Sequence, residues 1–467
     1  MKKILACFLA ILLIGCSTET STTSSSSSGS ATNNETTNTS TNTPSTNTAS
    51  KKPETKEAFN TSGTIDEQTL YDSNGVLVKA TELTYESSRA KLLLNVENNS
   101  DKKVQILSGT LGFSCNAVNN WMVHDGWINI EVPAGKKAND SAYLDYSQLQ
   151  ACGINGIDTL YLTLEVIFGE GYSNRIKTDP IAIKTKLKNS QDKELPFDEI
   201  ATNLMNIYGN RTLQYYENKE IFNSANVRVN DIAYFTSSSG DKILVLSLFN
   251  DGDQVLNVDS CGISANGFSL CTGRWSSEPI IPGKKGYMSL ELNHMKDDED
   301  WKAMGITEVS DITLEIGVLN LDYDYLSEPQ TINIHVADLD TSSNSDSSED
   351  VLYSANGIRI ISKSLTDDYS DVKWKLLIEN SNDFEIQVSD GWGNKLSVND
   401  YMIDYIMWSE YIGAHQSSIA EVEISKNALK DAGIDPDNLG VAEIELEIKD
   451  ENYNDIDSPK ISYDFSK

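Results

Sequence analysis

The sequence predicts a mainly β protein: three tandem β-sandwich domains, each with one short helix, behind a disordered N-terminal tether. Landmarks of one kind recur three times in the same order. Alternating apolar and polar residues fill each recurrence, as in half-buried strands, and a tract of Ser, Thr and Asn precedes them all. The expected parts are a signal peptide (1–15), the tether (16–66), the first sandwich (67–187), a helical linker (188–220), the second sandwich (221–337), an acidic flexible linker (338–350) and the third sandwich (351–467).

The first residues have the layout of a secretory signal, with a short basic start and an unbroken apolar run over residues 4–14. The run is too short to cross a bilayer, which takes about 20 apolar residues. It ends at Leu-Ile-Gly-Cys, residues 13–16. This sequence resembles the lipobox of bacterial lipoproteins.

The resemblance implies that Cys16 carries a diacylglycerol with fatty acyl chains such as palmitate, and that the chain is cleaved before Cys16. Burying two or more chains gives a stable membrane anchor, at about 0.8 kcal/mol per methylene. The alternative is an ordinary cleavable signal, but the small-residue cleavage site expected of one is absent. Ser17 is not the aspartate associated with inner-membrane retention, so the choice of membrane stays open.

The tract from Ser17 to about Ser62 has almost no apolar residue to bury, so we expect it to be disordered. A flexible coil of about 46 residues spans roughly 35 to 40 Å. Such a tether is most useful across a thick Gram-positive wall. We therefore expect a lipid-anchored protein on the extracellular face of a bacterial cell membrane, in a Gram-positive setting.

The composition is strongly acidic, with a net charge of −33 and a pI of about 4.4. Nucleic acid is bound by neutralising its phosphates with Lys and Arg, and the chain has no basic stripe for this. We expect no nucleic-acid partner. The acidity indicates solubility and mutual repulsion at a surface, with binding of cations or of a basic partner as the alternative.

Three units of one design follow the tether. Each begins with a short strand after a turn, continues with an alternating strand that ends in a polar turn, and reaches a step of Asn, a polar residue and an aromatic one. A short helix then stops at glycine, and a long alternating strand precedes a last strand led by proline. These landmarks fall at Asn119, Asn266 and Asn399; at Gly153, Gly305 and Gly433; and at Pro180, Pro329 and Pro459.

The long strand over residues 158–166 alternates apolar and polar side chains, which indicates a sheet wetted on one face. Since each unit holds many strands and one short helix, a second sheet is the natural cover. The units resemble the Ig-like β-sandwich modules found in tandem on Gram-positive surface lipoproteins, although the Cys…Trp…Cys spacing of immunoglobulin domains is not reproduced.

Two segments connect the units. Residues 196–207 carry proline at a helix start, acidic residues in the first turn and apolar residues at helical spacing, which predicts a docking helix. Residues 338–350 are acidic and Ser-rich, which predicts a flexible hinge and a third unit that moves more freely.

Catalytic motifs are not expected. Ser-x-x-Lys occurs at Ser88, Ser239 and Ser370, but each lysine begins an alternating run, where residues three apart point to opposite faces. We interpret these serines as hairpin turns. The four histidines have no metal-ligand spacing. The sequence therefore predicts a protein that is not an enzyme and that has no metal site of a known pattern.

Carboxylates gather before the last strand of the second and third units, where calcium binding is the alternative to a solvated turn. No other cofactor is expected. The residues are Asp322 and Asp324, and Asp450, Glu451, Asp455 and Asp457.

Four cysteines lie beyond the lipobox. An even number in an exported chain permits disulfides. We predict the local bridges Cys115–Cys152 and Cys261–Cys271, with buried thiols as the alternative.

The third unit is rich in aromatic residues between its middle strand and its helix, and these either fill the core or form an exposed platform for sugars or peptides.

We expect a non-enzymatic surface lipoprotein that binds a glycan, a cell-wall polymer or a protein partner, with a spacer role as the alternative. A pocket of carboxylates and a histidine would instead favour catalysis. The candidate platform residues are Trp392, Tyr401, Tyr405, Trp408 and Tyr411.

Overall fold

The computed structural model describes residues 58–109, 115–171, 173–338, 350–391 and 396–467. The chain from Glu57 to Lys467 forms one compact unit. With 56% of residues in strands and 8% in helices, the predicted mainly β class is confirmed. The predicted signal peptide and residues 16–57 of the tether lie outside the described residues.

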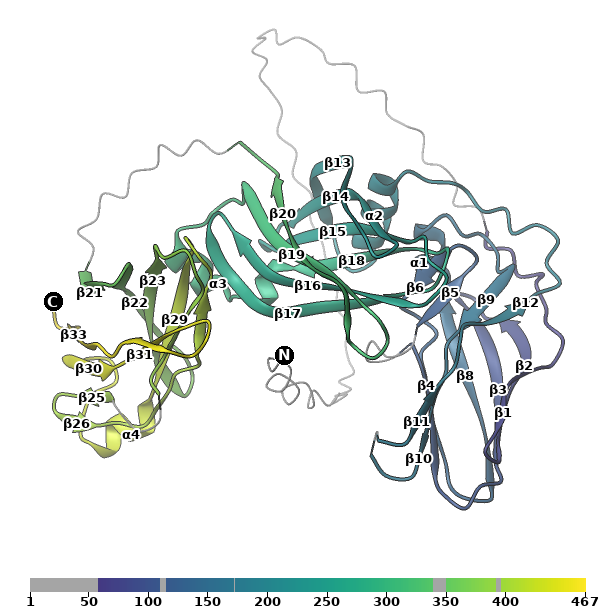
Figure 1. Cartoon of the computed structure of the whole chain (residues 1–467), viewed down its shortest axis with the longest axis horizontal. Helices are drawn as coiled ribbons and strands as arrows, with labels where there is room; N and C mark the ends of the chain where they lie inside the picture. The colour runs from purple at the N-terminus through teal and green to yellow at the C-terminus, as the bar shows by residue number, and fades with distance from the viewer. Residues whose placement is uncertain (1–57, 110–114, 172, 339–349, 392–395) are drawn as a thin grey trace, which may run out of the picture. The chain divides into compact units, whose positions relative to one another are not determined.

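The first module has one four-stranded sheet, β1-β2-β3-β8, and a second face built from two pieces, β11-β10-β4-β7 and β12-β9-β5-β6 (Figure 1). Its elements are β1 (Gln68–Ser73), β2 (Val76–Tyr85), β3 (Arg89–Asn98), β4 (Val104–Ser108), β5 (Asn116–Val118), β6 (Trp121–Val123), β7 (Ile128–Val132), β8 (Lys136–Asp145), α1 (Tyr146–Ala151), β9 (Thr159–Leu162), β10 (Glu165–Phe168), β11 (Arg175–Lys177) and β12 (Ile181–Lys184).

The second module follows helix α2 (Phe197–Met205) and has the sheets β13-β14-β15-β18 and β20-β19-β16-β17. Its elements are β13 (Arg211–Ser224), β14 (Val227–Ser237), β15 (Lys242–Asn250), β16 (Leu256–Ala265), β17 (Phe268–Ile280), β18 (Lys285–Glu291), the 3-10 helix η1 (Leu292–His294), α3 (Asp298–Met304), β19 (Asp311–Leu319) and β20 (Tyr325–His335).

The third module has the sheet β21-β22-β23-β29 and, on its other face, β28-β24-β31-β32 and β26-β25-β30-β33. Its elements are β21 (Asp350–Ala355), β22 (Ile358–Asp367), β23 (Asp371–Asn380), β24 (Ile386–Ser389), β25 (Leu396–Val398), β26 (Tyr401–Met402), β27 (Tyr405–Ile406), β28 (Glu410–Ile412), β29 (Ser417–Ser425), α4 (Lys426–Asp431), β30 (Val441–Glu445), β31 (Glu447–Asp450), β32 (Asp455–Asp457) and β33 (Lys460–Asp464).

The three modules share one strand order. In each, the first three strands lie side by side, and the strand before the short helix joins the third one. In the second module β15 pairs with β18, β16 with β19, and β19 with β20. These are the B–E, C–F and F–G pairings of an immunoglobulin-like sandwich. The Ig-like architecture therefore holds without the disulfide of true immunoglobulin domains.

One expected strand is divided. The alternating run over residues 158–166 forms β9 and β10, which belong to different pieces of the second face. Between them the Thr163 hydroxyl donates to the Cys115 carbonyl oxygen (3.0 Å) and accepts from the Cys115 N–H (2.6 Å). The Thr178 hydroxyl accepts from the Leu164 N–H (2.9 Å). Side-chain hydroxyls thus replace backbone partners and interrupt the ladder.

The short helices end as predicted. Gly153, Gly305 and Gly433 have φ angles of 79°, 73° and 75°, in the left-handed region that glycine adopts without strain. At Gly153 a Cβ would lie 2.2 Å from the Lys193 carbonyl oxygen, so the linker also requires glycine there. The Asp297 side chain caps α3 by accepting from the Asp300 N–H at 2.7 Å.

A buried asparagine ends the third strand of every module. Asn98 Nδ2 donates to the Lys102 and Val132 carbonyl oxygens at 2.7 and 2.9 Å. Asn250 and Asn380 make the equivalent bonds in the other modules. Each asparagine ties the polar turn to the strand across it, because its buried amide requires partners. This position explains why the alternating strand ends in Asn in all three units.

The Asn-polar-aromatic step forms a turn that we call the Asn turn. Asn119, Asn266 and Asn399 have φ angles of 52°, 50° and 48°. Their Oδ1 atoms accept N–H bonds at the start of the strand after the helix, at 2.9 Å from Asp158, 2.8 Å from Ser310 and 2.9 Å from Val441. The turn therefore holds the same position in all three modules. The residues following Asn119, Asn266 and Asn399 are Asn120 to Met122, Gly267 to Ser269, and Asp400 to Met402.

The first joint connects the first and second modules. Here β6 runs parallel to β18, with Trp121 opposite Lys285. The Lys285 N–H donates to the carbonyl oxygen of Asn120, the residue after the Asn turn's asparagine, at 2.9 Å. Lys284 Nζ donates to the Asn119 carbonyl oxygen at 2.6 Å. The second face of one module thereby continues into the first sheet of the next.

The second joint connects the second and third modules by the same contact. Here β17 runs parallel to β29, with Phe268 opposite Ser417. The Ser417 N–H donates to the carbonyl oxygen of Gly267 at 3.0 Å. Since Gly267 also directly follows the asparagine of its Asn turn, the two joints are equivalent. The third module, expected to move freely, thus contacts the second.

Several expected boundaries shift. Phe59 is buried and stacks on Tyr146, with ring centroids 4.2 Å apart. Residues 58–66, assigned to the tether, therefore belong to the first module, because Phe59 supplies apolar surface that the rest of the tether lacks. Residues 211–220, assigned to the linker, begin β13. The predicted docking helix is α2. Its apolar face packs in the core of the first module, and Phe235 and Ile243 of the second module belong to the same core. Residues 339–349 of the acidic linker lie outside the described part.

Candidate functional site

The predicted aromatic platform divides. Tyr401 and Trp408 are 57% and 76% exposed, which fits a contact surface. Tyr405 packs against the core of the third module, and the Tyr411 carbonyl oxygen accepts from the Ser269 hydroxyl at the second joint (3.4 Å). Both residues are only partly exposed, so they are less accessible to a ligand than Tyr401 and Trp408. Trp392 lies outside the described residues.

An exposed tryptophan recurs in every module. Trp127 lies just before β7, Trp275 within β17 and Trp408 just before β28, with exposed fractions of 62%, 40% and 76%. All three follow the Asn turn of their module in the strand segment that leads to the next turn. Large aromatic side chains usually bury most of their surface. The recurrence therefore makes this position the candidate site in each module.

Sequence reasoning found only Trp408 of this set. The signal was present, because Trp127, Trp275 and Trp408 each follow the aromatic residue of the Asn turn by six or seven positions. Exposure could not be predicted from that spacing, since an aromatic residue next to a strand is as compatible with a core position.

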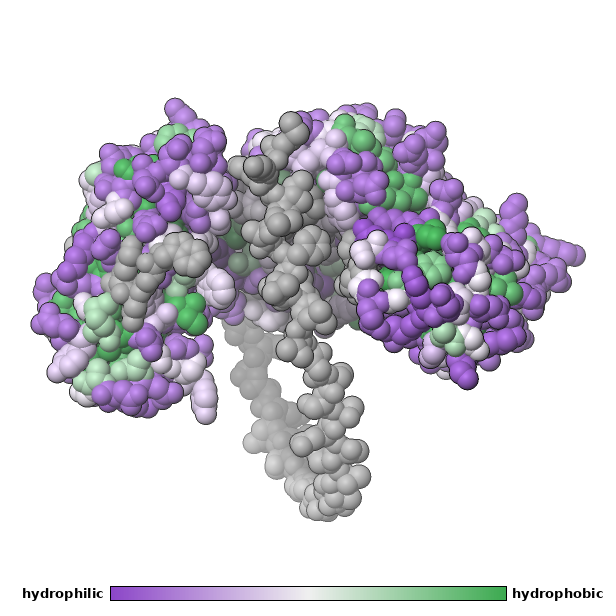
Figure 2. Space-filling view, turned by 60° about the horizontal axis from the view of Figure 1, so that its bottom comes forward, coloured by the Kyte–Doolittle hydropathy of each residue, from purple (hydrophilic) through white to green (hydrophobic). Residues whose placement is uncertain are grey.

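The face of the described residues drawn in Figure 2 is largely hydrophilic, with small hydrophobic patches scattered over it. An indole exposed on such a surface offers a flat apolar face to a ligand. It can stack on the apolar face of a sugar ring or on a peptide side chain, at little cost in conformational entropy.

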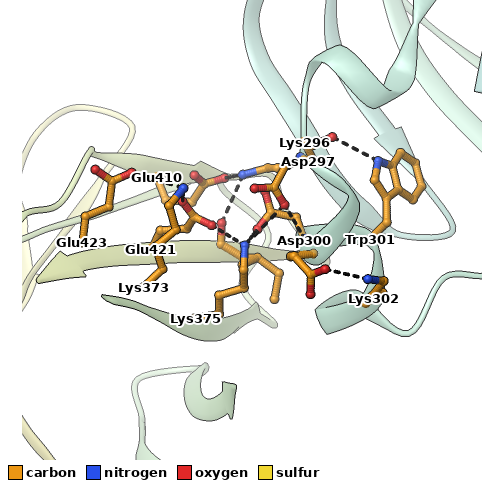
Figure 3. Close-up of polar contacts among 12 residues, drawn as sticks. Lys296, Asp297, Asp300, Trp301, Lys302, Lys373, Lys375, Glu410, Glu421 and Glu423 are labelled. Atoms are coloured by element: carbon orange, nitrogen blue, oxygen red, sulfur yellow. Dashed lines mark hydrogen bonds and ion pairs between the residues drawn. The ribbon is translucent and has the colours of Figure 1, made fainter. Parts of the chain in front are cut away.

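A buried ion cluster holds the second joint. Lys375 Nζ, from β23, lies 2.7 Å from Asp300 Oδ1 and 3.4 Å from Asp297 Oδ1, and it also pairs with Glu421 of β29. The Lys375 side chain is fully buried. In Figure 3 its ammonium points into the group of carboxylates contributed by both modules.

The electrostatics of this ion cluster follow from burial and pairing. Burial lowers the pKa of the Lys375 ammonium, but its hydrogen bonds to Asp300 and Glu421 outweigh burial and raise that pKa above its ordinary value. Burial raises the pKa of the Asp300 carboxyl. A second pair lies beside it, where Lys296 Nζ bonds Glu410 Oε1 at 2.8 Å.

Asp297, Asp300 and Glu421 are also spaced closely enough to ligate a metal ion. Lys375 Nζ already occupies the position between them, so a cation is supplied by the protein itself. The arrangement is therefore explained as an intermodule ion cluster, and it offers no vacant metal position.

A cavity of about 210 Å³ lies at the first joint. His124 and Cys115 line it from the first module, and Glu278 lines it from the second. Burial raises the pKa of Glu278 to about 7 and that of Cys115 to about 12, and it lowers the pKa of His124. Near neutral pH the cysteine is a thiol and the histidine is uncharged. The cavity thus joins a carboxyl group and a histidine, but it has no activated sulfur nucleophile.

The structure does not contain the predicted disulfides. Cys115 and Cys152 are free thiols in different core clusters. Cys261 donates a thiol hydrogen bond to Glu315 Oε2 (3.7 Å), and Cys271 donates one to the Gly273 carbonyl oxygen (3.5 Å). Neither pair is joined, because Cys115 and Cys152 lie in different core clusters and Cys271 of β17 lies opposite Ile263, not opposite Cys261.

The loops considered for calcium are turns in which side chains bond the backbone. Asp450 accepts from the Asn452 and Asn454 N–H groups, both at 2.8 Å. In the second module Asn320 takes this role toward Asp322 and Asp324, at 2.9 Å each. The oxygens of Asp450 are thus used within the turn. The remaining carboxylates of these loops are Glu451, Asp455 and Asp457, of which Asp457 accepts from Tyr353 and Asn356.

The three Ser-x-x-Lys serines lie in hairpin turns, as interpreted: Ser88 between β2 and β3, Ser239 between β14 and β15, and Ser370 between β22 and β23. In the described part of the chain, no helix is long and apolar enough to pass through a membrane.

Comparisons with known proteins give no identity. No family model and no curated protein matches the chain. Among solved structures it is similar to a crystal structure of red sea bream transglutaminase, at 9% identity and a TM-score of 0.15, covering 57% of this chain and 32% of that chain. The chain therefore spans about a third of the transglutaminase. It is also similar to the structure titled "Structural insight into host cell surface retention of a 1.5-MDa bacterial ice-binding adhesin", at 10% identity and a TM-score of 0.14, covering 84% of this chain and 90% of that chain. TM-scores this low carry no argument about function.

Proposed function

We propose that the chain is a lipid-anchored surface protein whose three modules bind an uncharged glycan polymer through Trp127, Trp275 and Trp408. The observation that carries the proposal is the exposed tryptophan at a recurring place in every module. A repeated ligand is the natural partner of a repeated site. Each indole stacks on one sugar ring of the same polymer.

Multivalency makes weak single contacts sufficient. Truncating a tryptophan that is the hot spot of a contact costs about 2 kcal/mol or more. Once one module has bound, the others meet the polymer at an effective concentration that can reach about the millimolar range. The joints support this because they connect neighbouring modules through shared sheets and through the ion cluster.

The net charge of the chain narrows the choice among ligand classes. A chain with a net charge of −33 repels polyanions, so phosphate-rich wall polymers are disfavoured relative to uncharged polysaccharides. A protein partner would have to meet the same acidic surface. We therefore place an uncharged glycan ahead of the other ligands considered for this protein.

The joints also favour the spacer role as a second candidate. Shared sheets and a buried ion cluster are what a stiff array of modules requires, and a spacer has no need of exposed tryptophans. The two roles are compatible, and the tryptophan variants below distinguish a spacer with a binding site from one without.

The test uses the chain from Ser17 onward, which lacks only the predicted leader and the lipidated cysteine. Co-sedimentation with insoluble uncharged polysaccharides and with purified cell-wall sacculi measures binding. We expect Trp→Ala at one of the three positions to weaken binding by about tenfold or more, and the triple variant to remain in the supernatant. Tyr369→Ala, at an exposed aromatic residue elsewhere in the third module, is the matched control. Equal sedimentation of the triple variant and the wild type would contradict the binding site.

The anchor is tested separately. We expect radiolabelled palmitate to enter the wild-type chain in cells and to be absent from a Cys16→Ala variant. Equal labelling of the two would remove the anchor from the proposal and leave the glycan site untouched.

A further inference from the structure

The same residues of the Asn turn make both joints inside the chain. We define the turn edge of each module as residues 119–122, 266–269 and 399–402. At the joints the last residues of this edge are covered: Met122 is 7% exposed and Ser269 is 1% exposed. Their counterpart Met402 is 59% exposed. The third module therefore presents uncovered a surface that is covered in the other two.

The third turn edge has the shape needed to dock. The Asn399 side chain bonds the Val441 N–H and the Leu439 carbonyl oxygen, as Asn119 and Asn266 bond the equivalent strand starts. Strand β26, which carries Tyr401 and Met402, lies at the edge of its sheet and pairs with β25. In the part of the chain that the structure describes, its other side has no strand partner.

The first module has the matching receiver. We define the receiving edge as residues 284–286 and 416–418 in the two joints and 136–138 in the first module. In the two joints, Lys285 and Ser417 each lie opposite the residue that precedes the strand-ending asparagine of their module, which is Asn250 or Asn380. In the first module, Lys137 likewise lies opposite the residue that precedes Asn98. Its strand β8 is also at a sheet edge, pairing with β3 among the described strands.

The receiving edge of the first module resembles the one at the first joint in detail. Residues 134–138 read Ala-Gly-Lys-Lys-Ala, and residues 282–286 read Pro-Gly-Lys-Lys-Gly. The glycines Gly135 and Gly283 both have a φ of 68°. At the first joint the second of these lysines, Lys285, places Nζ over the Trp121 ring, 5.8 Å from its centroid. Lys285 makes this contact while it also lies 3.7 Å from Glu194 Oε1, and Lys137, which lies 2.8 Å from Glu97 Oε2, can offer the same cation–π contact to Tyr401.

Charge favours the contact between the two unpartnered edges. The turn edge of the third module is flanked by the exposed carboxylates Asp400 and Asp404, and the receiving edge of the first module carries the exposed ammonium groups of Lys136 and Lys137. Glu97 already pairs with Lys137, so Lys136 supplies most of the attraction to Asp400 and Asp404, against the background repulsion of a chain with a net charge of −33.

We propose that the turn edge of the third module docks on the receiving edge of the first module in a second copy of this chain, so that copies join head to tail. The expected register places Tyr401 opposite Lys137, with the Lys137 N–H donating to the Asp400 carbonyl oxygen. Because the two surfaces differ, the contact is heterologous and extends to chains of copies. The inference goes beyond glycan binding and uses none of the three tryptophans.

The test is sedimentation equilibrium of the chain from Ser17 onward, over about 10 µM to 1 mM, which detects dissociation constants in the micromolar to millimolar range. We expect the weight-average mass of the wild type to rise with concentration beyond that of a dimer. Met402→Arg blocks the turn edge and Lys136→Glu blocks the receiving edge, so each variant alone should remain monomeric. Mixed together, they retain one complementary pair of edges and should form dimers and nothing larger.

Leu326→Arg, at an exposed leucine on β20, is the matched control and should associate like the wild type. Circular dichroism melting curves check that the exposed substitutions leave the fold intact. A wild type that stays monomeric over the whole range overturns the proposal. So does association of Lys136→Glu alone at wild-type strength, because that result would show that the contact does not use the receiving edge. Glycan binding by Met402→Arg reports on the proposed function independently.

Discussion

The ion cluster at the second joint predicts a large loss of stability when Lys375 is replaced by Met. The substitution keeps much of the side-chain volume and removes the ammonium that lies 2.7 Å from Asp300 Oδ1. Asp300, which is largely buried, then loses its counter-ion, while Glu421 keeps only its pairing with Lys373. Breaking a buried pair by removing one partner typically costs about 3 to 5 kcal/mol, because a buried charge is left uncompensated.

The neighbouring Lys373 is the matched control. Its Nζ lies 3.2 Å from Glu421 and 3.6 Å from Glu423, but all three side chains remain partly exposed. Partly exposed pairs contribute about 1 kcal/mol or less. Lys373→Met should therefore shift the unfolding free energy of the module pair far less than Lys375→Met.

The pH dependence gives a second signature. Burial already raises the pKa of Asp300 with Lys375 present, and removing the ammonium raises it further. Because the folded-state pKa of Asp300 then lies well above the unfolded one, the folded state of the variant favours the protonated carboxyl. The deficit of Lys375→Met should be largest near pH 7 and should shrink as the pH falls toward 4.

Urea unfolding followed by tryptophan fluorescence measures this, since Trp374 lies beside Lys375 and Trp301 lies on α3 at the joint. Equal midpoints for Lys375→Met and Lys373→Met at pH 7 would refute the reasoning that the cluster is a buried intermodule ion pair. A deficit that does not change with pH would refute the role given to Asp300.

Three further predictions concern the cores and the first joint. Because burial raises the pKa of Glu278 to about 7, above its ordinary value, the unfolding free energy of the wild type should fall as the pH rises from about 4.5 to 7. Glu278→Gln should increase the unfolding free energy by up to about 3 kcal/mol at pH 8 and by little at pH 4.5, as measured by urea titration. Asn250→Ala should cost about 2 to 3 kcal/mol, because the buried hydrogen bond to the Ile280 carbonyl oxygen and the part-buried one to the Gln254 carbonyl oxygen are both lost. Asn218→Ala at an exposed site should cost under about 0.5 kcal/mol, and equal costs would contradict this. Cys115 and Cys152 should resist iodoacetamide in the native protein and react after unfolding without reductant, by mass spectrometry.

Much of the fold was predictable because the same landmarks recur in the sequence of all three units. The Asn turn, the glycine after each helix and the alternating strands each have a local cause, such as a left-handed backbone at Gly305 or a capped strand start at Asn266. Local causes leave local patterns in a sequence. The division of the strand over residues 158–166 was not predictable, because it depends on hydroxyl groups of Thr163 and Thr178 that meet backbone groups far away in the chain.

The site was predictable only in part. Trp408 stood out because several aromatic residues lie near it in the sequence, whereas Trp127 and Trp275 each have only the aromatic residue of the Asn turn within seven positions. Whether a residue such as Tyr411 is covered depends on the next module, and no single-module pattern contains that information. For the same reason the sequence did not predict the joints, where Lys375 meets carboxylates contributed by α3 of another module.

The most direct test of the proposed function is a series of binding isotherms on an immobilised uncharged polysaccharide, for chains that keep three, two, one or none of Trp127, Trp275 and Trp408. The account predicts that the apparent affinity falls at every step, and that the drop from three to two shrinks when the polysaccharide is cut to lengths that reach only one module. A chain without any of the three tryptophans that binds as tightly as the wild type would contradict it.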